Sequence, residues 1–172
     1  MRLFYIFTVF LLIIGCCIPN KTVPIYHLTN GKIAEKAGVM LLTDTDKGLL
    51  VRVSVENLPP GPHGFHIHEN PSCAALTTAQ GTFQTAGHAG NHYDPQKTGT
   101  HQGPGGSGHL GDLPVLWADL NGFATATFTL SGLTVADFIN RSVIIHEFGD
   151  NYRDLPLPSG GGGARIACGI IE

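Results

Sequence analysis

Short stretches in which apolar and polar residues alternate recur along this chain, whereas helical periodicity is hard to find. In the clearest stretch, Val51, Val53 and Val55 would face one side of a strand, and the polar residues between them would face the other. Such alternation is typical of a half-buried strand. Further β-rich stretches span residues 39–43, 65–69, 115–120, 124–130, 143–148 and 164–171. Gly, Pro and Asn turn signals separate them, which predicts an all-β antiparallel sandwich or barrel of about eight strands.

Two long segments interrupt this pattern, and we expect them to be functional loops. Residues 70–114 are rich in Gly, Thr and His and lack an apolar period, while residues 149–163 end in four consecutive glycines. Loops of this length are uncommon in a compact domain unless something fixes them. Because the first loop contains one Cys and four His, we expect a disulfide and a bound metal to offset the entropy lost on ordering it.

Length and charge narrow the class of function. The 172 residues suit one domain with a hydrophobic core. Charged residues make up 13% of the chain, the formal net charge is −3, and no run of Lys or Arg occurs. A nucleic-acid partner bound through a basic face is therefore not expected. The chain has nine His, several of them close together, which points instead to metals.

The N-terminus has the pattern of a signal peptide. Arg2 is a short cationic start, and residues 3–14 form a nearly unbroken apolar run that is too short to span a bilayer. The run leads into Ile13-Ile14-Gly15-Cys16, which resembles the lipobox of bacterial lipoproteins, in which the cysteine is lipidated after cleavage. The alternative is an ordinary signal peptide in which Cys16 is incidental.

The lipobox interpretation predicts the organisation of the whole chain. We expect a lipoprotein signal peptide over residues 1–15, a tether over residues 16–30 and one folded domain over residues 31–172. A lipid on Cys16 would hold this domain at a membrane in the periplasm or cell envelope of a bacterium.

Cys73 and Cys168 remain once Cys16 and Cys17 are assigned to the anchor region. In a chain exported to an oxidising compartment, a disulfide between them would persist. The alternative is two buried free thiols.

His66 and His68 are the first candidate metal ligands. Residues two apart on a strand point to the same face, so both imidazoles would project together while Phe65 and Ile67 enter the core. An H-x-H motif alone is a weak indication of a metal site. On a helix the same spacing would send the two side chains to opposite sides.

The long loop strengthens the metal hypothesis. His92, His101, His109 and Asp112 offer the nitrogen and oxygen ligands that suit zinc, and four such ligands would close a tetrahedral structural site. His146, at the end of a predicted strand, adds another imidazole. The alternative is a set of solvated loop histidines, and the number of candidate ligands argues against it.

Four segments of the sequence are similar to motifs of the copper/zinc superoxide dismutases, especially the bacterial periplasmic branch. These segments are Gly64-Phe65-His66-Ile67-His68-Glu69, Gly90-Asn91-His92-Tyr93-Asp94-Pro95, His109-Leu110-Gly111-Asp112-Leu113-Pro114 and Gly163-Ala164-Arg165-Ile166-Ala167-Cys168-Gly169. The resemblance covers residues 30–172. It implies a Greek-key β-barrel or sandwich and an enzyme that dismutates superoxide to dioxygen and hydrogen peroxide.

The same resemblance implies a set of metal ligands, with one copper and one zinc per subunit. The implied copper ligands are His66, His68, His92 and His146. The implied zinc ligands are His92, His101, His109 and Asp112, so that His92 bridges both metals as an imidazolate. No ligand position of the family is missing from this chain.

The family also implies roles for residues that are not metal ligands. Asp150 matches a carboxylate that links a copper-ligand His to a zinc-ligand His, and such outer contacts fix imidazole orientation. Cys73 and Cys168 fall on the disulfide positions of the family. Arg165 matches the arginine that guides superoxide to copper by its positive charge.

The implied reaction makes Arg165 and His92 the expected catalytic residues. Copper would cycle between Cu(II) and Cu(I), and His92 would take up a proton when its bond to copper breaks. Superoxide is the expected substrate, and the subunit would act as a monomer or a homodimer.

A few positions depart from the family or stay unassigned. Asn91 stands where many bacterial relatives have Gly, and Glu147 and Phe148 stand where small residues are usual, which affects the expected shape and charge of the channel. Arg153 is the one cation in residues 149–163, so steering by lysines of that loop is not expected. Three histidines have no role: His63 and His88 are expected to be exposed, and His27 falls in the expected tether.

Two other classes of function compete with the enzyme. A copper or zinc buffer would need the ligands but neither Arg165 nor a shared His92. An interaction module with the bare fold would be expected to have lost ligands. The retained ligands and Arg165 together favour the enzyme.

Overall fold

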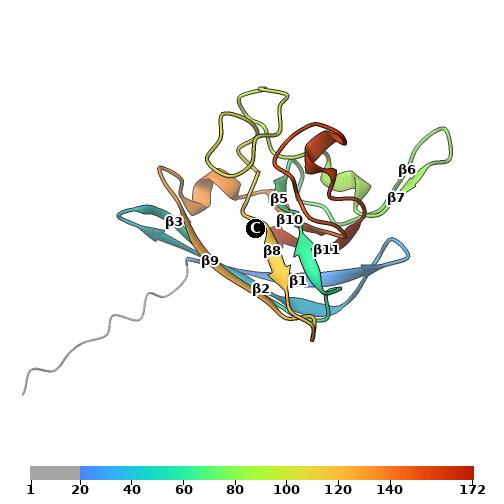
Figure 1. Ribbon diagram of the computed structural model, residues 1–172, viewed down its shortest axis with the longest axis horizontal. Coiled ribbons are helices and arrows are strands. Elements are labelled where there is room, and N and C mark those ends of the chain that lie inside the picture. The colour runs from blue at the N-terminus through green and yellow to red at the C-terminus, as the bar shows by residue number, and fades with distance from the viewer. Residues whose placement is uncertain (1–19) are drawn as a thin grey trace, which may run out of the picture.

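The computed structural model describes residues 20–172, so the predicted signal peptide and lipidated Cys16 lie outside the described residues. The chain forms a nine-stranded antiparallel sheet in the order β4-β8-β9-β3-β2-β1-β11-β10-β5, and a separate two-stranded hairpin of β6 and β7 (Figure 1). The strands are β1 (Lys21–Thr29), β2 (Lys32–Thr45), β3 (Gly48–Val55), β4 (Gly61–His63), β5 (Phe65–His68), β6 (Leu76–Thr77), β7 (Phe83–Gln84), β8 (Leu116–Ala118), β9 (Ala124–Leu130), β10 (Arg141–His146) and β11 (Arg165–Ile171). The 3₁₀ helices are η1 (Gly87–Ala89), η2 (Val135–Phe138) and η3 (Pro158–Gly161). Within residues 20–172, no helix has the length and apolar character needed to cross a membrane.

The two edge strands of the main sheet are consecutive in the chain. β4 ends at His63 and β5 begins at Phe65, so Gly64 alone joins one edge of the sheet to the other. The Gly64 N–H donates to the carbonyl oxygen of Phe148 at 2.7 Å, and the Gly64 carbonyl accepts from the N–H of His146 at 2.8 Å. These bonds continue the pairing of β5 with β10. On its other edge β5 bonds to Gly111 and Leu113, just before β8, so the sheet curls into a nearly closed barrel whose seam lies at β5. The predicted all-β antiparallel barrel is confirmed.

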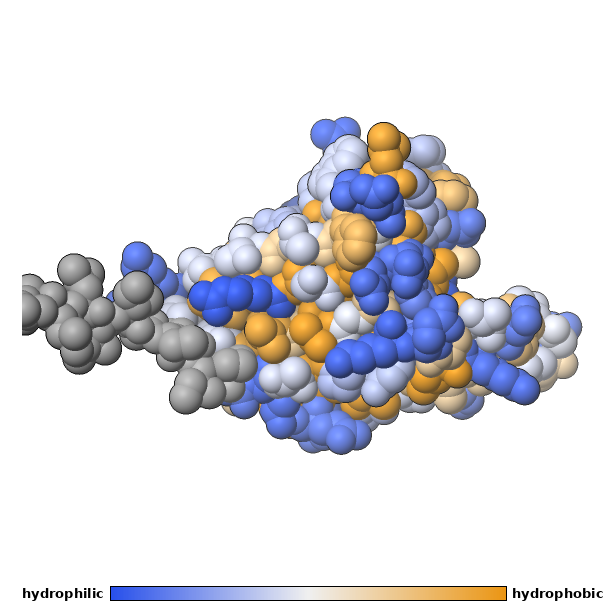
Figure 2. Space-filling view, turned by 90° about the horizontal axis from the view of Figure 1, so that it is seen from below, coloured by the Kyte–Doolittle hydropathy of each residue, from blue (hydrophilic) through white to orange (hydrophobic). Residues whose placement is uncertain are grey.

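β3 shows how the sequence pattern produces the barrel wall. Val51, Val53 and Val55 are buried, whereas Arg52 and Ser54 between them face solvent. Each buried valine stabilises the fold by about 1.5–3 kcal/mol relative to an exposed one. The outer surface seen from below in Figure 2 accordingly mixes hydrophilic residues with small apolar areas.

The predicted tether over residues 16–30 is wrong for most of its length, because residues 21–29 form β1. This strand pairs with β2 and β11, and its Val23 and Ile25 are fully buried. Pro24 separates these two residues, and register shifts after Ile25 and Tyr26 interrupt the period of two. The alternation therefore stops after a few residues, which is why the sequence did not reveal the strand.

The first long loop is held at its start by a disulfide and carries some regular structure. Cys73 is bonded to Cys168 of β11, and their Cα atoms are 5.8 Å apart. The expected disulfide is therefore confirmed, and the alternative of two free thiols is excluded. The hairpin of β6 and β7, followed by η1, occupies part of residues 70–114, which sequence analysis described as lacking structure.

Candidate metal centre

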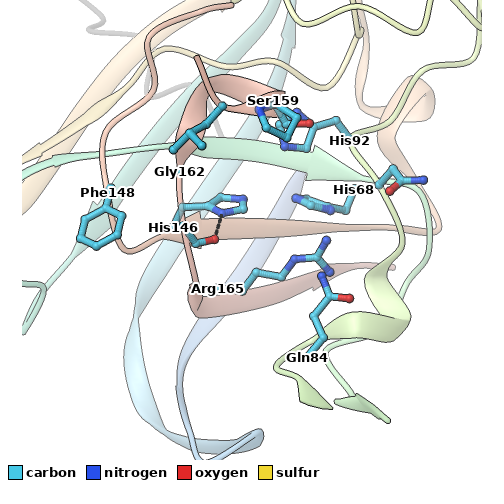
Figure 3. A pocket seen from close by; sticks show the side chains of 13 residues that line it. His68, Gln84, His92, His146, Phe148, Ser159, Gly162 and Arg165 are labelled. Atoms are coloured by element: carbon cyan, nitrogen blue, oxygen red, sulfur yellow. Dashed lines mark hydrogen bonds between the residues drawn. The ribbon is translucent and has the colours of Figure 1, made fainter. Parts of the chain in front are cut away.

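A cavity of about 310 Å³ opens beside the seam of the barrel. Three of the predicted ligands, His68, His92 and His146, line it together with Arg165 (Figure 3). Arg165 is the one charged side chain of the lining; the other lining side chains include Gln84, Asn91, Phe148, Leu157 and Ser159.

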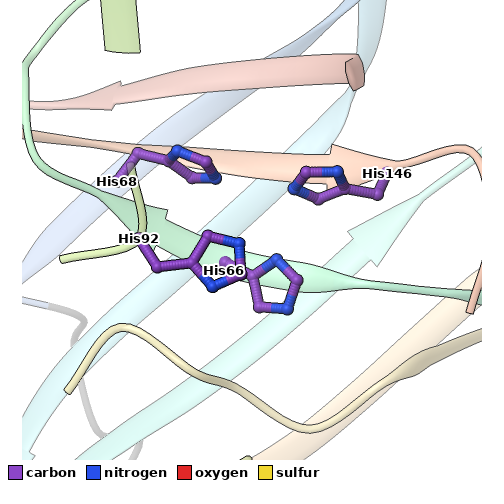
Figure 4. Close-up of side chains that lie close together, drawn as sticks. All are labelled: His66, His68, His92 and His146. Carbon is purple, nitrogen blue, oxygen red and sulfur yellow. The ribbon is translucent and has the colours of Figure 1, made fainter. Parts of the chain in front are cut away.

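Two neighbouring strands present histidines to this cavity. β5 pairs with β10 so that His66 lies opposite Ile144 and His68 opposite Ser142, and both imidazoles share one face of β5, as their spacing predicts. His146 ends β10. His92 comes from the long loop, which forms a bridge at His68. One ring nitrogen from each of the four histidines lies within 4.8 Å of the others (Figure 4).

The outer nitrogens of three of these rings are already hydrogen-bonded. His66 Nε2 donates to Asp150 Oδ2 at 2.7 Å, His68 Nδ1 to the Gly90 carbonyl at 3.0 Å, and His146 Nδ1 to the Gly163 carbonyl at 3.3 Å. Their inner nitrogens, His66 Nδ1, His68 Nε2 and His146 Nε2, are buried and have no partner. Buried polar atoms in proteins are normally hydrogen-bonded or otherwise satisfied, so these three nitrogens are suited to bind one metal ion together.

The protonation of these four histidines suits ligands. Burial lowers the pKa of His66, and burial with the neighbouring histidines lowers the pKa of His68 and His146 well below the ordinary value. Burial lowers the pKa of His92 to about 4. All four imidazoles are therefore neutral near pH 7, and a neutral imidazole has a lone pair for a metal.

A second group gathers around Asp112. His92 Nδ1 lies 3.1 Å from Asp112 Oδ1, His109 Nδ1 lies 3.4 Å from the same oxygen, and His101 Nδ1 lies 2.9 Å from Oδ2. The Nδ1 atoms of His101 and His109 nevertheless make no hydrogen bond. They approach the carboxylate without being oriented toward it as donors. Such an arrangement is expected when all these atoms are ligands of one ion.

The two groups share His92 and are joined by Asp150. His92 Nδ1 faces Asp112, which leaves Nε2 for the first group. Asp150 accepts from His66 Nε2 at 2.7 Å and from His101 Nε2 at 2.8 Å, so one carboxylate orients an imidazole of each group. The predicted linking position of Asp150 is thus where the structure places it.

The charges around His101 differ from those in the first group. Burial would lower the pKa of His101, but its contacts with Asp112 and Asp150 outweigh burial and raise that pKa to about 9. Burial would raise the pKa values of Asp112 and Asp150. Contacts of Asp112 with His101 and His92, and of Asp150 with His101 and His66, nevertheless keep both pKa values below the ordinary range. Two carboxylates are therefore charged beside this group, which favours a cation there.

Arg165 is fixed at the mouth of the cavity by backbone oxygens. Its two terminal nitrogens donate to the carbonyl of Ala86 at 2.6 Å and to the carbonyl of Gly90 at 2.7 Å. The Gly90 carbonyl also accepts from His68 Nδ1. Burial lowers the pKa of Arg165, but a guanidinium keeps its charge at neutral pH.

The unassigned histidines have different surroundings from those expected. The expectation that His63 is exposed is wrong: it is buried, with Nδ1 2.7 Å from the His146 carbonyl and Nε2 2.7 Å from the Pro59 carbonyl. Closure of the barrel at Gly64 covers this turn, which no local pattern reveals. His88 is exposed, as expected, and His27 lies in β1.

The departures from the family pattern affect the cavity and not the ligands. Asn91 lines the cavity without a left-handed backbone conformation, and Phe148 lines it with its ring 57% exposed. Glu147 and Arg153 are exposed and do not line it.

Sequence analysis did not single out Gly90 and Gly160 as residues that shape the site. Gly90 has a φ of 80° and supplies the carbonyl that His68 and Arg165 share. A Cβ on Gly160 would collide with Asp150 and His101. Gly90 lies two residues before the predicted ligand His92, and Gly160 lies ten residues after Asp150. This closeness in sequence is the one signal that could have indicated either glycine.

Comparison with known proteins gives a consistent family. The family model described as "Copper/zinc superoxide dismutase (SODC)" matches residues 36–171. A superoxide dismutase [Cu-Zn] of Legionella pneumophila is 46% identical over 153 residues, which cover 89% of this chain and 87% of the relative.

Solved structures agree with this family. The Cu/Zn superoxide dismutase from Brucella abortus matches with a TM-score of 0.84 and 44% identity, over 88% of this chain and 99% of that chain. The monomeric copper, zinc superoxide dismutase from Salmonella enterica matches with a TM-score of 0.76 and 42% identity, with the same coverage.

Asp112 is the residue whose replacement should separate the two groups. We predict that Asp112→Ala weakens Zn²⁺ binding at least about tenfold, which removes about 1.4 kcal/mol of stabilisation at saturating zinc and lowers Tm by about 3–6 °C. Copper binding should change less, because Asp112 belongs to the second group alone. Metal titration and thermal unfolding of the purified domain measure both effects. Asp46→Ala, in an exposed turn, is the control; wild-type zinc affinity and Tm in Asp112→Ala would contradict the prediction.

Proposed function

Because this chain belongs to the copper/zinc superoxide dismutase family, whose members convert superoxide to dioxygen and hydrogen peroxide, we propose that the two ligand groups hold its copper and its zinc separately. The proposed copper ligands are His66, His68, His92 and His146. The proposed zinc ligands are His92, His101, His109 and Asp112.

One observation carries this assignment. Within residues 20–172, nine buried side-chain polar atoms have no hydrogen-bond partner, and five of them are ring nitrogens of the proposed ligands. Leaving a buried polar group unsatisfied costs about 1–3 kcal/mol. Two bound metals would satisfy all five, and the donor types, imidazole and carboxylate, are those that copper and zinc accept.

We infer which metal each ligand group binds from whether that group lines the cavity. The cavity is lined by three imidazoles of the first group, so this group is open to a small substrate. The second group shares only His92 with the lining. Three imidazoles and a carboxylate complete a closed tetrahedral shell, which is the pattern of a structural zinc. We therefore assign copper to the open group and zinc to the closed one.

Arg165, His92 and Asp150 each have a separate role in the proposed reaction. When bound, copper supplies the exchange of one electron with each superoxide. Arg165 attracts the anion and orients it, because its charge is held rigidly at the cavity mouth by two carbonyls. His92 Nε2 takes up and delivers a proton, and two protons are consumed for each hydrogen peroxide formed. Asp150 keeps the rings of His66 and His101 oriented through both steps.

His146 tests the open group. We predict that His146→Ala lowers the dismutation rate at least about a hundredfold, since it removes an imidazole whose only free nitrogen faces the other three. Zinc content should stay near that of the wild type. A superoxide-consumption assay with metal analysis measures both, and His88→Ala, which replaces an exposed histidine of η1 that belongs to neither ligand group, should keep full activity. Near-normal dismutation by His146→Ala would overturn the copper assignment.

Arg165 tests the enzyme against a metal buffer, because a guanidinium cannot be a metal ligand. We predict that Arg165→Ala keeps both metals and loses at least about tenfold in kcat/KM, equivalent to about 1.4 kcal/mol of barrier. Arg165→Lys should fall between, since it keeps the charge and loses the planar donor fork.

The control for this prediction is Arg153→Ala, an exposed cation outside the cavity lining, which should change the rate less than about twofold. Added salt should slow the wild type more than Arg165→Ala, because screening weakens a long-range attraction. Equal rates for wild type and Arg165→Ala at low ionic strength would favour the metal buffer.

We further propose that lipid on Cys16 holds the enzyme at a membrane of the bacterial cell envelope, where it removes superoxide from the periplasm. The disulfide between Cys73 and Cys168 fits an oxidising compartment. Because β1 begins at Lys21, only residues 17–20 separate Cys16 from the barrel, a span of about 14 Å when fully extended. The pairing of β1 with β11 places Arg165 near the opposite end of β1 from Lys21, so the cavity lies at the end of the strand that is farther from the anchor.

Replacement of Cys16 tests the anchor. We predict that Cys16→Ser abolishes incorporation of labelled palmitate and moves the protein from the membrane fraction to the soluble fraction, with unchanged specific activity. Cys17→Ser should stay in the membrane fraction. Palmitate labelling of Cys16→Ser at the wild-type level would contradict the proposal.

A further inference from the structure

Tyr152 lies in the second long loop and has an unusual backbone conformation. Its φ is 57°, in the left-handed region that bulky side chains rarely adopt. Such a conformation persists only where surrounding contacts determine it, and it is often associated with function. Three contacts hold Tyr152: two connect it to the metal centre and the third attaches it to the barrel.

The first contact is with Asp150. The Tyr152 N–H donates to Asp150 Oδ1 at 2.7 Å. The same oxygen accepts from His101 Nε2 at 2.8 Å, while Oδ2 accepts from His66 Nε2 at 2.7 Å. This bond helps to hold the Asp150 carboxylate so that Oδ1 faces His101 and Oδ2 faces His66.

The second contact is between the Tyr152 ring and Gly103. A Cβ on Gly103 would lie 2.6 Å from Cγ and from Cδ1 of the ring, so the ring lies against the glycine backbone. The Gly103 N–H donates to Asp112 Oδ2 at 3.3 Å. The ring therefore packs against Gly103, whose N–H helps to orient the Asp112 carboxylate of the second ligand group.

The third contact attaches this loop to the barrel. The Tyr152 hydroxyl accepts from the Val115 N–H at 3.0 Å, directly before β8. Tyr152 of residues 149–163 thus contacts Gly103 within residues 70–114 and Val115 directly after them.

We propose that Tyr152 is a positioning residue of the zinc site: it orients Asp150 through its N–H and Asp112 through the contact of its ring with Gly103. The inference rests on the ligand assignment of the proposed function. Both carboxylates of the centre then contact one residue of the opposite loop, Asp150 through the backbone N–H and Asp112 by way of the ring and Gly103.

Two variants of Tyr152 separate its parts. Tyr152→Leu removes the ring and the hydroxyl, and we expect the Zn²⁺ dissociation constant to rise at least about tenfold, the effect typical of an outer partner of a ligand. Tyr152→Phe keeps the ring against Gly103 and loses only the bond to Val115, and a rise of about threefold is expected. Competition with a chelator measures the affinity. Co²⁺ in the zinc site supplies a visible spectrum that reports ligand geometry.

A matched control distinguishes positioning from stability. Tyr26→Leu removes a tyrosine of β1 that belongs to neither ligand group and does not line the cavity, so it should lower Tm without changing the zinc affinity or the Co²⁺ spectrum. An unchanged spectrum and a zinc dissociation constant within twofold of the wild type in Tyr152→Leu would overturn the proposal. Should Tyr152→Leu not fold, the same two readouts on Tyr152→Phe decide, and wild-type values for both would overturn it.

A double-mutant cycle tests the route through Asp150. Tyr152→Leu keeps the backbone N–H, so the cycle asks whether loss of the side chain also displaces this N–H from Asp150; if it does, the loss of zinc affinity in Asp150→Asn with Tyr152→Leu is smaller than the product of the single losses. A product of independent losses would overturn this route. Asp112→Ala is measured in parallel: intact zinc binding in that variant would refute the ligand assignment itself, whatever Tyr152→Leu shows.

Discussion

Unpaired imidazole nitrogens inside the barrel are the constraint on which the rest of the structure depends. Each inner nitrogen of His66, His68 and His146 is buried without a partner, while the outer nitrogen of the same ring is bonded to the protein. The outer bonds fix the rings so that they cannot turn to find other partners. Protein groups thus prepare the site and a metal completes it, because at about 1–3 kcal/mol per unsatisfied group the empty arrangement is costly.

This centre also lies where the fold closes. Gly64 connects the two edges of the sheet and is bonded on both sides to the chain around His146. His66 follows two residues later on β5. The buried His63 adds a further connection between this turn and the His146 carbonyl. Backbone bonds that extend the β5–β10 pairing thus also position His66 and His146.

The sequence predicts part of the candidate site through local spacing, whereas the full ligand sets follow from the resemblance to the family. Residues two apart on a strand share a face, so His66 and His68 had to project together. β1 was missed because Pro24 and the register shifts around Tyr26 hide its alternation. His63 and Gly160 could not be placed, since burial at the seam and a close approach to Asp150 arise from segments far apart in the chain. Tertiary neighbours, and not local pattern, decide such positions.

The electrostatic design follows from how few charges surround the cavity. The whole chain has a formal net charge of −3, which repels an anion at long range, and the cavity lining offers Arg165 as its single cation. A lone charge can guide a substrate only if its position relative to the metal is fixed. The Gly90 carbonyl provides that, because it accepts from both Arg165 and His68. The proposed guiding charge and a proposed ligand of the open group are thereby held by one backbone oxygen, and this shared carbonyl is what fixes Arg165 relative to the His68 ring.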